Sequence, residues 1–125
     1  MLSQSIHNQN NILGAAMQGQ SARLDAIFNN IANAETPRYA ARRVEFESAL
    51  GDAIDNWRAT GTLDLTNARP VTRFQDMGSR TRMDGNNVDI EREMVALFTE
   101  SVRYDVMAMS VMHNSRMINT VLQGR

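Results

Sequence analysis

Few residues in this sequence have the types and spacing that catalysis or metal binding requires. The two histidines, His7 and His113, lie near opposite ends of the chain, and no H-x-x-x-H or H-E-x-x-H spacing offers a helical zinc site. The run DGNNVD at residues 84–89 is the best calcium candidate, but it lacks the residue order and the closing glutamate of an EF-hand loop. We interpret it as a turn that leads into a helix N-cap.

Other catalytic signatures are missing from the sequence. The chain has 125 residues and no cysteine, which excludes disulfides, thiolate zinc sites and a cysteine nucleophile. Neither common glycine-rich phosphate-binding pattern occurs. A basic cluster of Arg38, Arg42 and Arg43 could bind an anion or an acidic neighbour, or could be a solvated face. The sequence therefore favours a protein that is not an enzyme and that uses no cofactor or metal.

Charge and hydropathy exclude further classes of function. The chain has 13 arginines, no lysine and 14 acidic residues, which gives a formal net charge of -1. Nucleic acid or an anionic membrane surface as main partner would require a basic excess. No segment approaches the roughly 20 apolar residues that span a bilayer. The first ten residues are uncharged and polar, unlike a secretory signal, so we expect any export to use a route without a cleaved signal peptide.

Both ends of the chain show apolar residues in alternating steps of four and three, the 3.5-residue repeat of a coiled-coil seam. The first series runs from Ile6 to Ile31 and the second from Ile90 to Leu122. Asp89 is a suitable N-cap for the second helix and Gly124 a suitable stop, whereas Thr36 and Pro37 end the first helix near Asn33. The positions that we expect to pack against other helices, within or between subunits, are Leu13, Met17, Leu24, Ile27, Ile31, Met94, Leu97, Tyr104, Ala108, Val111, Ile118 and Leu122.

These patterns predict an all-α fold: an elongated antiparallel pair of long N- and C-terminal helices with coiled-coil-like seams. We expect one domain over residues 1–125, with a first helix at 1–34, a turn, a short helix and a loop at 35–88, and a last helix at 89–123. The short helix is predicted near residues 44–58. Within the loop, one short extended pair is predicted between Val71–Phe74 and Arg80–Met83.

The length and the apolar surface of the last helix also predict assembly with other subunits. Thirty-five residues, at 1.5 Å each, extend roughly 50 Å, which exceeds the diameter of about 35 Å of a compact domain of this size. A second apolar stripe lies beside its seam, at Val95, Phe98, Val102, Met109 and Met112. Because one partner helix cannot cover two stripes, part of this surface is expected to face other subunits.

One segment carries a family resemblance. Residues 29–39, NNIANAETPRY, resemble the N-N-I-A-N-x-x-T-P-x-Y signature of bacterial flagellar basal-body rod and hook proteins, and residues 40–50 and 85–104 resemble the continuation in the proximal-rod type. The matching motif residues are Asn29, Asn30, Ile31, Ala32, Asn33, Thr36, Pro37 and Tyr39. The family usually has glycine where this chain has Arg38, so either the turn has another geometry or Arg38 adopts a strained backbone.

The resemblance implies a structural subunit of the proximal rod, in the periplasmic part of the flagellar basal body, that assembles with helical symmetry and transmits torque. It also implies flagellar type III export. The implied partners are further copies of the chain, other rod proteins, the FliE-type junction protein and the export gate. Three alternatives remain: the neighbouring rod protein of the FlgC type, a soluble helical adaptor or export chaperone, and a metal-dependent enzyme that uses residues 84–89.

Overall fold

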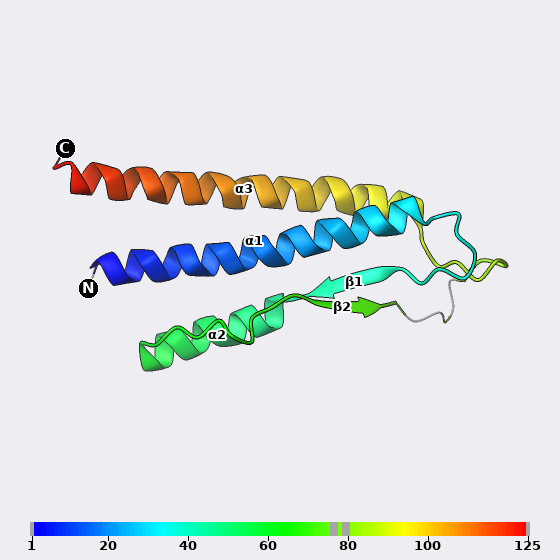
Figure 1. Cartoon of the computed structure of the whole chain (residues 1–125), viewed down its shortest axis with the longest axis horizontal. Coiled ribbons are helices and arrows are strands. Elements are labelled where there is room, and N and C mark those ends of the chain that lie inside the picture. Colours follow the sequence, from blue (N-terminus) through cyan, green and yellow to red (C-terminus); the bar gives the residue numbers. More distant parts are fainter. Residues whose placement is uncertain (1, 76–77, 79–80, 125) are drawn as a thin grey trace.

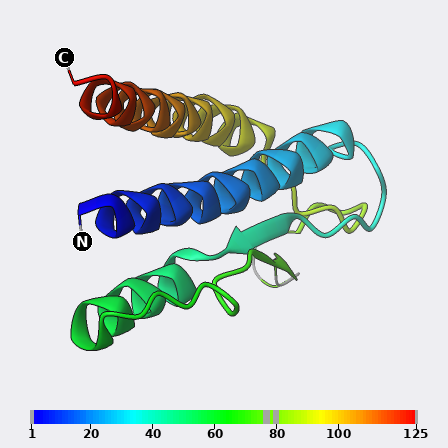
Figure 2. The same cartoon turned by 60° about the vertical axis from the view of Figure 1, so that its left-hand side comes forward.

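The computed structural model describes residues 2–75, 78 and 81–124. Within them the elements follow the order α1 (Leu2–Ala32), β1 (Arg42–Glu45), α2 (Glu47–Thr60), β2 (Val71–Phe74) and α3 (Ile90–Leu122). Figure 1 shows an elongated molecule with α1 in the middle, α3 along one side of it, and α2 and the two strands along the other. Figure 2 shows the same order of layers from a second direction. The start of α1 and the end of α3 lie at the same end of the molecule.

Both long helices begin and end close to the predicted residues. Asp89 has an extended backbone, and its carboxylate accepts a hydrogen bond from the backbone N–H of Arg92 at 3.2 Å, which caps α3. At the other end, Gly124 adopts a positive φ of 65° just beyond the helix. These ends are accurate because caps and chain breakers act over only a few residues.

The face of α3 that packs on α1 contains much of the predicted seam together with polar residues beside it. Three polar contacts join the helices: Asn30 with Glu93, Gln20 with Glu100, and Asn10 with Asn114. The expected seam position Met94 is instead 53% exposed, and Leu122 is 78% exposed. The helix is thus rotated so that polar residues alternate with Leu97, Tyr104, Val111 and Ile118, which are half-buried. The antiparallel helix pair agrees with the prediction, and Met94 and Leu122 are the predicted packing positions on α3 that stay exposed in the single chain.

The fold is mostly helical, but the prediction of an all-α fold needs correction because β1 and β2 form a small antiparallel sheet. Arg42 lies opposite Phe74, and Glu45 lies opposite Val71. The predicted extended segment at 71–74 is present, but its partner is β1; residues 81–83 form no strand, and Arg80 lies outside the described residues. The four residues of β1 lack the polar–apolar alternation that identifies a strand.

Helix α2 begins at Glu47, three residues later than predicted, because Arg42–Glu45 is a strand. It ends at Thr60, and the next residue, Gly61, has a φ of 76° and donates its N–H to the carbonyl of Trp57. Between α1 and this helix lies the main apolar core of Ala26, Val44, Phe46, Leu50 and Ala68. No helix in the described part of the chain is long and apolar enough to cross a membrane.

Gly19 in the middle of α1 allows the closest contact of this core. A Cβ atom at that position would overlap the ring of Phe46. The guanidinium of Arg23, one turn further along α1, lies 4.8 Å from the centroid of the same ring. Phe46 is therefore enclosed by the surface of α1, which fixes how α2 leaves the strand.

Candidate functional site: a polar junction and an uncovered helix face

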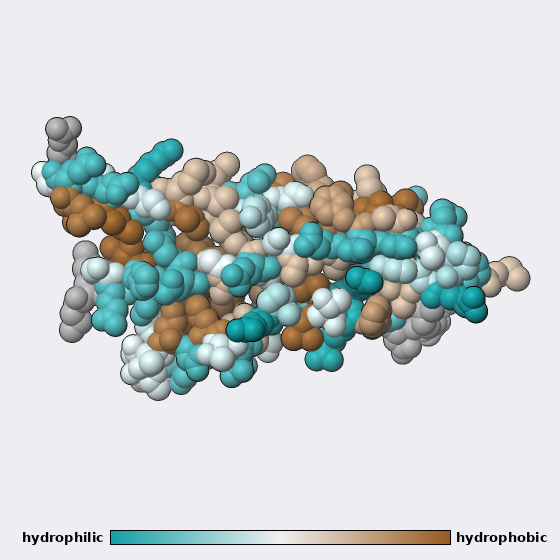
Figure 3. Space-filling model, in the orientation of Figure 1, coloured by the Kyte–Doolittle hydropathy of each residue, from teal (hydrophilic) through white to brown (hydrophobic). Residues whose placement is uncertain are grey.

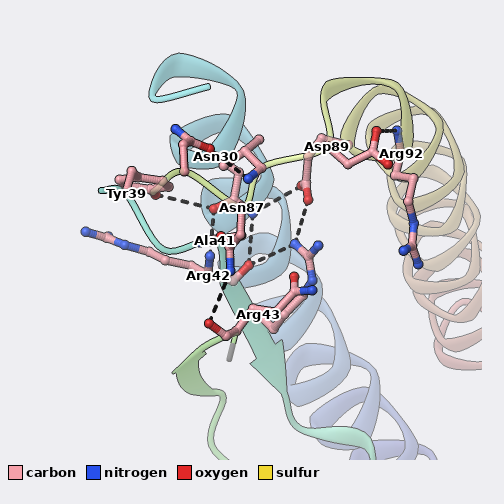
Figure 4. Close-up of polar contacts among 12 residues, drawn as sticks. Asn30, Tyr39, Ala41, Arg42, Arg43, Asn87, Asp89 and Arg92 are labelled. Atoms are coloured by element: carbon pink, nitrogen blue, oxygen red, sulfur yellow. Dashed lines mark hydrogen bonds and ion pairs between the residues drawn. The ribbon is translucent and has the colours of Figure 1, made fainter. Parts of the chain in front are cut away.

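Asn30 joins three elements at the end of α1. Its side chain is fully buried; the Nδ2 group donates to the carbonyl of Arg42 at 2.9 Å and to Oε2 of Glu93 at 3.1 Å. Its Oδ1 accepts from the backbone N–H of Arg42 at 2.7 Å and from the hydroxyl of Tyr39 at 3.3 Å. Figure 4 shows Asn30 and Tyr39 beside the start of β1. One motif residue therefore ties α1 to β1 and α3.

Asn86 fills the turn that follows α1. Its buried Nδ2 donates to the carbonyls of Asn33 at 2.8 Å and Thr36 at 2.7 Å, while its Oδ1 accepts from the backbone N–H of Val88. The hydroxyl of Thr36 donates to Oδ1 of Asn33 at 3.1 Å. The carbonyls of Asn33 and Thr36 in the turn after α1, which already accept backbone N–H groups, thus each obtain a second donor from Asn86, 53 and 50 residues away.

Asn87 makes the equivalent connection to the strands. Its Oδ1 accepts from the backbone N–H of Ala41 at 2.6 Å, and its Nδ2 donates to the carbonyl of Gln75 at 3.3 Å (Figure 4). We call Asn30, Asn33, Asn86, Asn87 and Glu93 the polar junction. The sequence predicted a turn at residues 84–87 but no role for Asn86 and Asn87 in joining α1 to the strands. The paired asparagines, separated by Val88 from the helix cap Asp89, were the available signal, but they do not identify their partners.

Arg38 adopts the strained backbone that the sequence left as one of two alternatives. Its φ is 59°, in the left-handed region that favours glycine, and its N–H donates to the carbonyl of Asp84 at 2.9 Å. Gly85 lies against it: a Cβ on Gly85 would come within 3.3 Å of the Cα of Arg38. The turn thus keeps a glycine-like geometry although the residue is arginine.

The three predicted basic residues do not form one surface. Arg38 is exposed at the turn, whereas Arg43 pairs through Nη1 with Oε1 of the buried Glu93 at 2.6 Å. Arg42 lies 5.9 Å from the centroid of the Phe74 ring. Figure 4 shows the side chains of Arg42 and Arg43 leaving the strand in different directions. A cleft of about 260 Å³ between β1 and α3 is lined by Arg23, Ala26, Ile27, Arg42, Arg43, Val44, Arg92, Glu93, Ala96 and Glu100.

Several charged side chains that line this cleft form ion pairs. Arg23 pairs with Glu47 at 2.5 Å and lies 3.8 Å from Glu100. The hydrogen bond from Arg23 lowers the pKa of Glu47 to about 2, and the same contact raises the pKa of Arg23. These charges fasten α1 to α2 and α3, which is a structural role.

The carboxylates of residues 84–89, the calcium candidate, accept hydrogen bonds from the chain itself. Asp84 accepts from the backbone N–H of Asn86 at 3.0 Å and from Arg82 at 3.2 Å, and Asp89 caps α3. Within residues 2–75, 78 and 81–124, no three histidine, aspartate or glutamate side chains gather in a way that could hold a metal. The interpretation as a turn leading to an N-cap is confirmed.

The side of α3 that points away from α1 is an uncovered apolar surface. We call it the α3 outer face; it consists of Val95, Phe98, Val102, Val106, Met109 and Met112, all exposed. Phe98 is 74% exposed and Val95 68%. Figure 3 shows apolar side chains along the edge of the molecule that α3 forms. On α1, by contrast, Phe28 is the only large apolar side chain that is exposed among those described.

The predicted packing residues fall into two groups. Those on α1 are half-buried or, for Ile27, buried, and on α3 Leu97, Tyr104, Ala108, Val111 and Ile118 are half-buried. Met94 and Leu122 are exposed. Of the motif residues outside the polar junction, Asn29, Ala32, Thr36 and Pro37 are exposed, and Ile31 and Tyr39 are half-buried.

Comparisons with known proteins agree with these features. A family model described as "Flagella basal body rod protein" matches residues 11–39, which contain most of α1 and the turn. "Flagellar basal body rod protein FlgB" of Yersinia enterocolitica is 34% identical over 102 residues, covering 71% of this chain and 74% of the relative. The protein of the same name from Borrelia hermsii is 32% identical, with 82% and 87% covered. That from Bacillus subtilis is 28% identical, with 99% and 97% covered.

Proposed function

The chain belongs to the FlgB family of flagellar basal body rod proteins, and we propose that it builds the proximal rod by packing its long helices against neighbouring subunits. It is a structural component of the flagellar basal body rod and not an enzyme, and it assembles with other rod components. The neighbouring rod protein of the FlgC type was the alternative within the family. The relatives described above carry the FlgB name, which favours the proximal-rod type.

The uncovered α3 outer face carries the proposal. Six apolar side chains on one side of a long helix stay exposed, from 46% for Val102 to 74% for Phe98. Burial of a large apolar side chain such as Phe98 contributes about 2 kcal/mol. Exposed apolar patches of this kind are typical of protein–protein contacts. A subunit that is covered by its neighbours in a rod obtains this stabilisation, and a free monomer does not.

We assign different roles to the predicted packing residues. Met94 and Leu122 contact neighbouring subunits, because the chain itself leaves them exposed. The half-buried positions on α1 and α3 hold the helix pair together. The motif residues and the polar junction set the angle at which the chain leaves α1. Among the three basic residues, the exposed Arg38 is the one available to an acidic neighbour.

The remaining parts of the proposal rest on the family. The whole chain, residues 1–125, acts as one rod-core domain that transmits torque by packing alone. It reaches the periplasmic part of the basal body through the flagellar type III export apparatus, without a cleaved signal peptide. Its neighbours include further copies, the FliE-type junction protein and the export gate. The family membership supports each of these statements.

The proposal is tested by placing a charge on the α3 outer face. We expect Phe98→Glu to abolish swimming and rod assembly while secretion of the subunit and its helical circular dichroism persist, because Phe98 has few contacts in its own chain. Asn56→Glu on the exposed side of α2 is the control and should swim normally. Normal swimming and normal basal bodies in Phe98→Glu cells would overturn the proposal.

A further inference from the structure

Residues of opposite charge lie at the two ends of the α3 outer face. One helical turn before Val95 on the same side of α3 lies Glu91, and one turn after Met112 lies Arg116. Both side chains are exposed, and neither has an ion-pair partner in the described part of the chain. The apolar stripe is therefore bounded by an acid at the start of the helix and by a base towards its end.

This order of charges is complementary to itself only when two copies of α3 run in opposite directions. In an antiparallel pair, Glu91 of each copy lies beside Arg116 of the other. The same alignment places Val95 opposite Met112 and Phe98 opposite Met109. A parallel pair would instead bring like charges together at both ends. Residues 91–116 extend roughly 38 Å along the helix, so the two ion pairs would lie far apart and would fix one alignment.

We propose that the free subunit forms a two-fold symmetric dimer through the α3 outer face, with Glu91 of each copy paired to Arg116 of the other. The inference rests on the proposed function, because it concerns the same face before assembly. A two-fold contact uses the same patch on both copies and closes, whereas a rod must grow through contacts that do not close. The dimer therefore covers the assembly face and prevents premature growth.

Asp105 makes this dimer weak enough to be released. It lies within the stripe, near the two-fold axis that the alignment defines, and it has no ion-pair partner among the described residues. In the dimer the two copies of Asp105 approach each other, and like charges in a partly desolvated contact oppose association. Contacts with neighbours in the rod can then replace the dimer contact.

Charge reversal tests the alignment. In the purified full chain, sedimentation equilibrium should show a dimer that weakens about tenfold in Glu91→Arg and in Arg116→Glu, since each single change converts both ion pairs into like-charge pairs. The double variant restores both pairs with their signs exchanged and should return to wild-type dimerisation. Asp105→Asn should tighten the dimer. Asp52→Arg on α2 and Arg69→Glu, both exposed, are matched controls that should change nothing.

Three outcomes would overturn the inference. The wild-type chain could be monomeric at 100 µM, or the double variant could remain as weak as the single ones. Phe98→Glu could also prevent swimming while leaving the free chain's association unchanged. In the last case the α3 outer face serves the rod but not a dimer, so the inference fails while the proposed function stands. Circular dichroism of every variant confirms that the helices are intact.

Discussion

Helices α1 and α3 have almost the same length, but their outer faces differ in polarity. Helix α1 is covered on two sides, by α3 and by α2 with the strands, and its remaining face carries mainly polar residues and Phe28. Helix α3 is covered by α1 alone, and its remaining face is apolar. The difference indicates that α1 completes the fold of one chain, whereas α3 is suited to burial in an assembly.

The largest effect is expected where α1 holds α3. Asn30→Ala removes four hydrogen bonds, including the one donated to the buried Glu93, whose ion pair with Arg43 remains. Since a buried charge that loses a donor is costly, we expect a loss of about 3 kcal/mol of unfolding free energy. Urea denaturation measures it. Asn29→Ala is the control, because that exposed side chain donates to the backbone of Asp25 within its own helix; an equal loss in both variants would contradict the role of the junction.

A smaller loss is expected on the side of α1 that faces α2. The added methyl group of Gly19→Ala would overlap the Phe46 ring, so the ring must shift, at a cost of about 2 kcal/mol. Gly14→Ala is a matched control on the same helix, where a Cβ would meet no atom within 4 Å, and it should be neutral or stabilising. Thermal unfolding followed by circular dichroism distinguishes the two. If Gly19→Ala also raised the melting temperature, the close contact with Phe46 would be refuted.

Acid should moderately weaken the contact between α1 and α2. The folded-state pKa of Glu47 lies at about 2, below its ordinary value of 4.5, so its pairing with Arg23 stabilises the fold above pH 4.5 and is lost as the pH falls towards 2. Because the Glu47 side chain is 58% exposed, water screens the pair and the contribution stays below about 1 kcal/mol. The urea midpoint of the wild type should therefore fall more steeply with acid than that of Glu47→Gln. Parallel curves for the two proteins would exclude the ion pair as a source of stability.

The smallest change in stability is expected on the α3 outer face. Phe98→Ser alters a side chain that is 74% exposed, and such surface substitutions usually change the unfolding free energy by less than about 0.5 kcal/mol. Urea denaturation of the isolated chain, at a concentration low enough that it is monomeric, should confirm this. A loss above 2 kcal/mol would mean that α3 is buried within its own chain, and the contrast between the helices would disappear.

Sequence reasoning located the long helices well and their contacts less well. The ends of α3 were predictable because Asp89 and Gly124 act on neighbouring residues. The rotation of α3 was not, because its most regular apolar stripes include the side that its own chain leaves uncovered. Periodicity identifies an apolar surface but not the molecule that covers it.

Strand β1 and the backbone of Arg38 also depend on contacts between segments that are distant in the sequence. Strand β1 was missed because its pairing depends on β2 and on Asn30, which donates to and accepts from the backbone of Arg42. For Arg38 the sequence left two alternatives, and only the structure distinguished a strained backbone from a different turn.

Composition, caps and a short motif thus established the helical class, the two long helices, the lack of catalytic groupings and the family. The three-dimensional arrangement alone specified the partners: Asn30 meets Glu93 across 63 residues, and Asn86 meets Thr36 across 50. The physical reason is that local signals depend on backbone hydrogen bonds within a few residues. A buried amide or carboxylate, in contrast, can be satisfied by any segment that folding brings to it, and neither segment's own pattern records the other.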